Sequence, residues 1–192
     1  MTKGLTLEQY REWLKEHGNN EEHKAADVAE RIIEYQTYHY VTTPFGEEPH
    51  VVLFPRQMVK ADGKRYECDL VIEITWRTMY RKLSRMMRIG VEFKEWDFQT
   101  VVAQALERKP FFDFMYIATR PHVLSLTYDP IMFNWLIKEG IGWVLWDDDL
   151  VYLLLPAKKR WMDAEFIVGK IEEIASTEVG RPRPTILDYL EG

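Results

Sequence analysis

Charged residues interrupt two apolar, strand-like segments of this chain. Residues 66–72 carry Asp69, and residues 89–94 carry Glu92 and Lys94. β-Branched and aromatic neighbours surround these charges, and burying an unpaired charge among such neighbours is costly. A divalent cation shared by the two acids would explain why the charges are tolerated there. The pattern therefore indicates two neighbouring strands that carry a metal-binding cluster.

The composition fits a globular chain with a sizeable core. The sequence has 192 residues, 46% of them hydrophobic and 14% aromatic, which suits one domain over residues 1–192. Its single cysteine, Cys68, excludes a disulfide within the chain and indicates a reducing compartment. No apolar run approaches the roughly 20 residues of a membrane span, and the N-terminus shows no apolar leader. We therefore expect a cytoplasmic protein without a membrane partner.

Periodicity and turn residues predict the order of the elements. We expect helices at residues 5–16, from about 20 to a β-type run at 38–41, and at 98–108, 130–139 and 162–174. We expect strands at residues 50–54, 65–74, 88–94, 114–118, 142–146 and 151–155. This order predicts an α/β fold, a mixed sheet flanked by helices.

Basic residues are concentrated in one stretch of an otherwise acidic chain. The net charge of −6 argues against a general nucleic-acid coat protein, because Lys and Arg dominate phosphate binding. Residues 75–90 nevertheless contain five basic residues and no acid. Methionines and a leucine recur there at helical intervals, so we expect a short helix or helical loop. The stretch is either a DNA-contacting element or an ordinary solvated face; its basic residues are Arg77, Arg81, Lys82, Arg85 and Arg88.

The order of helix, strands, Asp69, Glu92-x-Lys94, helix and strand resembles the PD-(D/E)xK nuclease superfamily. This superfamily has the restriction-endonuclease-like fold and includes archaeal Holliday-junction resolvases and RecB-type nuclease domains. The resemblance covers residues 20–118, and it makes residues 1–19 a helical addition. Residues 119–176 would be a C-terminal elaboration of helix, two strands and helix, followed by a tail at 177–192.

The resemblance implies an endonuclease that hydrolyses DNA with Mg²⁺ or Mn²⁺. Asp69, Glu92 and the backbone carbonyl of Phe93 would hold the metal, which activates a water molecule. Lys94 would orient that water or stabilise the charge on the phosphate. DNA would be the partner, and a homodimer would place two centres on the two strands of a duplex.

Strand geometry supports the cluster independently of the family. Glu92 and Lys94 share one side of a strand about 7 Å apart, while Phe93 points to the opposite layer. Neighbouring strands lie about 5 Å apart, so Asp69 can reach Glu92. Two convergent carboxylates favour a hard cation such as Mg²⁺ or Mn²⁺. The competing interpretation is an ion pair between strands on a solvated face, which contributes well under about 1 kcal/mol.

Two helices offer further candidates. Many members of the superfamily use an acid from the helix before the sheet, and Glu22 is placed near the packed face by the alanines that follow it, whereas Glu30 and Glu34 project away. Gln104 matches the glutamine of the RecB-type Gln-x-x-x-Tyr element, with Arg108 at the tyrosine position. Gln104 would otherwise cap its helix or face solvent.

Two other functions remain open from the sequence. The acidic net charge is compatible with a catalytically degenerate nuclease fold that works as a DNA- or protein-binding module. An RNA-cleaving enzyme would use the same residues and differ only in its substrate.

Overall fold

The computed structural model describes residues 4–44, 47–61, 64–78, 81–120 and 130–160, without the side chains of residues 61, 81–83 and 130–132. These residues belong to one unit, Met1–Arg160. The predicted helix at residues 162–174 and the tail at 177–192 lie outside the described residues.

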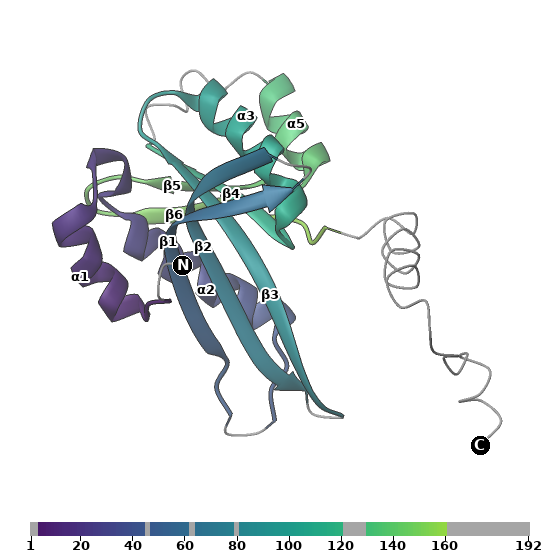
Figure 1. The fold of residues 1–192 in the computed structure, drawn as a ribbon. Coiled ribbons are helices and arrows are strands. Elements are labelled where there is room, and N and C mark those ends of the chain that lie inside the picture. The colour runs from purple at the N-terminus through teal and green to yellow at the C-terminus, as the bar shows by residue number, and fades with distance from the viewer. Residues whose placement is uncertain (1–3, 45–46, 62–63, 79–80, 121–129, 161–192) are drawn as a thin grey trace. The chain divides into compact units, whose positions relative to one another are not determined.

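Six strands form one mixed sheet in the order β1-β2-β3-β4-β5-β6 (Figure 1). β1, β2 and β3 are antiparallel neighbours, β4 and β5 run parallel to β3, and β6 is antiparallel to β5. Parallel neighbours need crossover connections, which is why helices follow β3 and β4. The strands are β1 His50–Ala61, β2 Lys64–Thr78, β3 Arg81–Lys94, β4 Phe114–Thr119, β5 Gly142–Trp146 and β6 Val151–Leu155. The prediction of a mixed sheet flanked by helices is confirmed.

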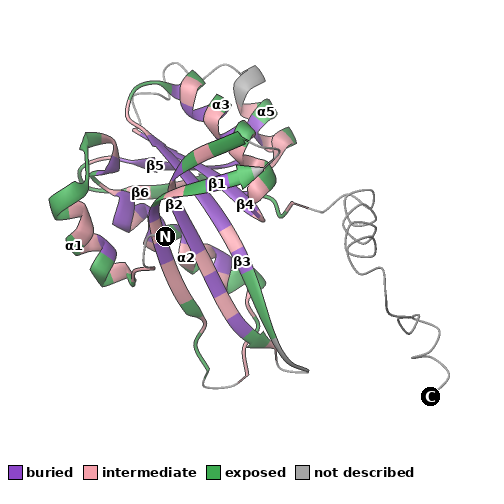
Figure 2. Ribbon diagram, viewed as in Figure 1, coloured by how far each residue is buried: buried purple, intermediate pink, exposed green. Residues whose placement is uncertain are grey.

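Helices cover both faces of the sheet and bury two apolar clusters. One cluster joins α1 and α2 to the sheet through residues such as Tyr10 and Ile32, and the other joins α3 and α5 through Val101 and Leu136. Of the sheet strands, β4 and β5 are buried along their whole length (Figure 2). The helices are α1 Leu7–His17, α2 Ala25–Tyr40, α3 Phe98–Arg108 and α5 Pro130–Glu139, with short 3₁₀ helices η1 Asn20–Glu22 and η2 Lys109–Phe111. None of the described helices is long and apolar enough to cross a membrane.

The N-terminal helix is part of the core. Leu5 exchanges backbone hydrogen bonds of 2.9 Å with Leu53 of β1, and the Tyr10 side chain is fully buried. Thr6 accepts a hydrogen bond from the Gln9 backbone N–H in a capping box, which fixes where α1 begins. Within residues 1–19, predicted as an addition, the described residues 4–19 therefore help to form the layer that covers the first strands.

The helix predicted in the basic stretch is wrong, because its described residues lie in two antiparallel strands, β2 as far as Thr78 and β3 from Arg81. The side chains of Ile72, Ile74 and Trp76 alternate into the core, and Met87 and Ile89 do the same from the opposing strand. This period of two buries more apolar surface than a short helix with one apolar stripe, and it overrides the helical spacing of the methionines.

The β-type run expected at residues 38–41 is also wrong, because α2 continues to Tyr40. Ring contacts support the last turn of this helix. The rings of Tyr35 and His39 lie 4.2 Å apart, and the Tyr40 ring lies 4.8 Å from Phe114 of β4. Aromatic packing against the sheet therefore outweighs the β-propensity of these residues.

β2 and β3 separate beyond the pair Leu70–Val91, and we call the gap between them the fork. Arg56 has a positive φ of 48°, which is rare outside glycine, and its place in the register faces Asp69 between the pairs Pro55–Leu70 and Gln57–Cys68. The pairing of β2 with β3 runs as far as Leu70 and Val91. Beyond that pair the backbone N–H of Phe93 donates to the Asp69 side chain at 2.8 Å. The fork therefore places a carboxylate where the ladder of backbone hydrogen bonds ends.

Candidate functional site

Two carboxyl groups meet in the fork between β2 and β3. Asp69 comes from β2 and Glu92 from β3, and the two side chains are close enough to share a hydrogen bond. Glu92 is only 1% exposed, and its Oε1 atom is buried without a hydrogen-bond partner among the described residues. Phe93 is buried in the opposite layer, so β3 alternates here as strand geometry predicts.

Burial and nearby negative charge raise the pKa of both acids. The pKa of Glu92 is raised to about 8, first by burial and then by the charge of Asp69, while the guanidinium of Arg108 opposes the shift. The pKa of Asp69 is also raised, first by burial, although the hydrogen bond from Phe93 lowers it. The buried pair therefore carries less than two negative charges near neutral pH, and a bound cation would let both groups ionise.

Arg108 reaches the same fork from the end of α3. Its Nε atom donates to the backbone carbonyl of Glu67 at 2.7 Å and lies 3.2 Å from Oε1 of Glu92. The side chain is 11% exposed, and its Nη1 atom is buried without a hydrogen-bond partner in the described part of the chain. A fixed positive charge thus partly neutralises Glu92.

Lys94 lies at the end of β3 and is held by an acid from η1. Its Nζ atom donates to Glu21 at 2.7 Å. Burial lowers the pKa of Lys94, but the hydrogen bond and charge of Glu21, followed by the charges of Asp69 and Glu92, raise it overall. The ammonium group therefore stays charged beside the two acids.

Glu22 lies in η1 rather than in the second helix, where it was predicted. Its side chain is buried and accepts the backbone N–H of Asn19, while the Asn19 side chain accepts the backbone N–H of Glu22. Nη2 of Arg56 donates to Glu22 at 2.9 Å. The charge of Glu22 contributes to the raised pKa of Asp69. Glu22 therefore belongs to the electrostatic surroundings of Asp69 but is already paired with an arginine.

The basic stretch does not gather at the fork. Arg85 is six positions before Val91 on the same strand, which puts it about 20 Å from the acids, and Arg77 opposes Ser84 at that distant end. Both are exposed. Arg88 pairs with Glu73 at 2.9 Å. The side chains of Arg81 and Lys82 lie outside the described residues.

Gln104 lies one turn before Arg108 on α3. Its Oε1 atom is buried and has no hydrogen-bond partner within the described residues, so it neither caps the helix through that atom nor faces solvent there. Arg108, at the position of the tyrosine in the RecB-type element, is the residue of this pair that contacts Glu92.

Four residues near the fork were not predicted from the sequence. Arg108 was recognisable only as a departure from a motif, and Glu21 only as one acid of a polar turn. The position of Arg56 depends on a backbone bend, with a positive φ, that no local sequence pattern predicts. Tyr10 is buried by tertiary packing, and burial followed by the charges of Glu22 and Asp69 raises the pKa of its hydroxyl.

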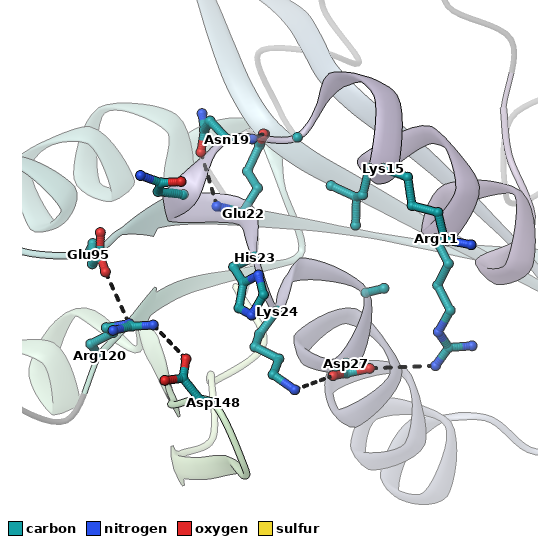
Figure 3. A pocket seen from close by; sticks show the side chains of 14 residues that line it. Arg11, Lys15, Asn19, Glu22, His23, Lys24, Asp27, Glu95, Arg120 and Asp148 are labelled. Atoms are coloured by element: carbon teal, nitrogen blue, oxygen red, sulfur yellow. Dashed lines mark hydrogen bonds and ion pairs between the residues drawn. The ribbon is translucent and has the colours of Figure 1, made fainter.

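A cavity of about 670 Å³ borders Glu22 (Figure 3). Figure 3 shows Arg120 between Glu95 and Asp148, and Asp27 between Lys24 and Arg11. Every lysine and arginine that lines the cavity is within ion-pair distance of a carboxylate. The cavity is therefore close to electrically balanced and offers no free positive charge to an anion.

The two acids fit a hard divalent cation with few protein ligands. In the described ranges, no group of three or more His, Cys, Asp or Glu side chains could hold a metal ion. Mg²⁺ commonly uses one or two carboxylates and takes its other ligands from water and substrate phosphate. Oε1 of Glu92 makes no hydrogen bond within the described residues, although the Arg108 guanidinium lies 3.2 Å from it. The raised pKa of Glu92 also agrees with that mode of binding. Comparisons with protein-family models, curated proteins and solved structures found no match to this chain.

Proposed function

We propose that this protein is a metal-dependent endonuclease of the PD-(D/E)xK type that hydrolyses DNA phosphodiester bonds. The convergence of Asp69 and Glu92 in the fork of the sheet, with Lys94 two residues after Glu92, is the observation that carries this proposal. Burying two acids side by side costs stability, and carboxyl groups with perturbed pKa values are typical of functional sites.

The restriction-endonuclease-like fold is part of the same proposal. Supporting features are an antiparallel run β1-β2-β3, the parallel strand β4 beside β3, and α3 as the crossover between them. Asp97 accepts the backbone N–H of Thr100 at 2.9 Å, which fixes the start of α3 just after Lys94. The elements α5, β5 and β6 would form the described part of the C-terminal elaboration.

Each residue of the fork has a defined task in this reaction. Asp69 and Glu92, with the backbone carbonyl of Phe93, would hold Mg²⁺ or Mn²⁺, which supplies an activated water and neutralises phosphate charge. The hydrogen bond from Phe93 fixes one oxygen of Asp69. Lys94 brings an ammonium group, oriented by Glu21, to stabilise the charge that develops on the phosphate.

The proposal is tested by incubating the protein with linear, branched and single-stranded DNA in Mg²⁺ or Mn²⁺. We expect cleavage that stops when the metal is chelated and that is lost in Asp69→Ala and Lys94→Ala variants. Glu107→Gln, an exposed change on the same helix as Arg108, is the matched control and should cut like the parent. If the Asp69→Ala and Lys94→Ala variants cut as well as the parent, the assignment fails. Matched RNA substrates decide between a deoxyribonuclease and a ribonuclease.

A second candidate is a degenerate nuclease fold that binds DNA or protein without cutting. The ion pair between Arg108 and Glu92 favours it, because a fixed internal charge already occupies one side of the acid pair. Calorimetric titration with Mn²⁺ separates the two functions. A nuclease should give binding heat that disappears in Glu92→Ala, whereas a binding module should give none.

Arg108→Gln is expected to tighten Mn²⁺ binding by about tenfold, because it removes a positive charge that lies 3.2 Å from a ligand oxygen. Calorimetry on the variant and the parent measures this difference directly. Arg31→Gln, an exposed change on α2, is the control for loss of one charge. Equal or weaker Mn²⁺ binding by Arg108→Gln would mean that the guanidinium does not compete with the metal.

A further inference from the structure

We propose that a second groove, lined by β1, the start of β2 and Phe111, binds the sugar-phosphate backbone of DNA and leads it toward the two acids. We call it the β1–β2 groove. The inference rests on the proposed function, because it names the surface by which the same site would hold its substrate.

The β1–β2 groove has a volume of about 640 Å³, and the charged residues that line it are all positive. Four basic residues line it and no acidic residue does. Its basic lining residues are Arg56, Lys60, Arg65 and Arg88, and Met58 and Phe111 are among the others.

Two of these cations are free to bind an anion. Lys60 and Arg65 oppose each other in the β1–β2 register, both are exposed, and neither forms an ion pair within the described residues. Arg56 and Arg88 are paired with Glu22 and Glu73. The cavity of Figure 3 differs, because each of its lysines and arginines already has a carboxylate partner. Charge complementarity therefore selects the β1–β2 groove for a polyanion.

The β1–β2 groove shares Arg56 with the surroundings of the candidate site. Arg56 lines the groove and also contacts Glu22, whose charge acts on Asp69. Arg65 precedes Asp69 by four positions on β2, a separation of about 13 Å along a strand. One nucleotide advances a DNA strand by about 3.4 Å along the helix axis, so the groove lies about four nucleotides from the acids.

The remaining lining suits the sugars and bases of the same ligand. Met58 is 46% exposed, and its end of β1 is largely exposed in Figure 2. The Phe111 ring lies 5.8 Å from Tyr66, which holds it at the edge of the groove. Apolar and aromatic side chains between cations are the arrangement that binds nucleic acid without sequence preference.

The test measures the binding of a fluorescent 30-base-pair duplex to the full chain in chelator, so that no cleavage occurs. In the double variant Lys60→Gln, Arg65→Gln we expect at least about tenfold weaker binding near 0.1 M salt. We also expect the slope of log K against log salt to fall by about 2, because each lost phosphate contact contributes about 0.9. The control Arg31→Gln, Lys138→Gln removes the same charge from exposed positions on α2 and α5.

Each outcome bears on the β1–β2 groove separately from catalysis. Weaker binding and a lower slope in the Lys60, Arg65 variant alone support the proposal, even if the parent never cuts DNA and the nuclease assignment fails. Equal losses in the control variant would show only an effect of net charge and overturn it. Unchanged binding by the double variant, or no binding by the parent, would also overturn it. Displacement of the duplex by polyglutamate as readily as by unlabelled DNA would identify an acidic polypeptide as the ligand instead.

Discussion

Glu92→Gln is expected to slow metal-dependent DNA cleavage by about a thousandfold. An amide keeps the size of the side chain but removes the charge that, together with Asp69, would hold the cation. A catalytic metal supplies several kcal/mol of charge stabilisation, and losing roughly 4 kcal/mol corresponds to about a thousandfold in rate. Single-turnover cleavage of whichever DNA the parent cuts best measures this loss.

Two comparisons show whether the loss comes from the acid itself. Glu107→Gln makes the same chemical change at an exposed position and should leave the rate unchanged. Glu92→Gln should remain folded, since an uncharged side chain removes its repulsion with Asp69. A folded Glu92→Gln variant that cuts within tenfold of the parent would show that Glu92 does not hold the catalytic ion.

The stability of the metal-free parent is expected to fall by a few kcal/mol as the pH rises from about 4.5 to about 8. Glu92 has a pKa of about 8 in the folded protein, against 4.5 for an ordinary glutamate, because of burial and then the charge of Asp69. In this window the folded chain binds more protons than the unfolded chain, so raising the pH favours unfolding. Each unit of difference in pKa is worth about 1.4 kcal/mol.

Urea denaturation at several pH values in chelator measures this dependence. Glu92→Gln should lose most of the decline in unfolding free energy between pH 5 and pH 8, whereas Glu107→Gln should follow the parent. Asp69, whose pKa is also raised, leaves a smaller decline in the Glu92→Gln variant. Parallel curves for the parent and Glu92→Gln would contradict the assignment of the raised pKa to Glu92. Saturating Mn²⁺ should remove the decline in the parent, since the ion favours the ionised acids.

Local patterns predicted the second half of the described fold closely. The expected elements at residues 98–108, 130–139, 142–146 and 151–155 coincide with α3, α5, β5 and β6. Each is bounded by strong local signals, such as Asp97 before α3 and Gly140, with a φ of 67°, after α5. The basic hairpin was mispredicted because its apolar residues satisfy both a helical and a strand period, and burial against α2 and the neighbouring strands decides between them.

The sequence by itself determined that Asp69 and Glu92 stand on adjacent strands, because the two-residue period and the strand spacing are properties of the backbone. Only the tertiary structure decided which charges surround them. Arg108 arrives from the end of α3, and Arg56 reaches Glu22 across a bend in β1. Such contacts join residues far apart in the chain, and their geometry depends on how helices pack on the sheet, which no short-range pattern encodes.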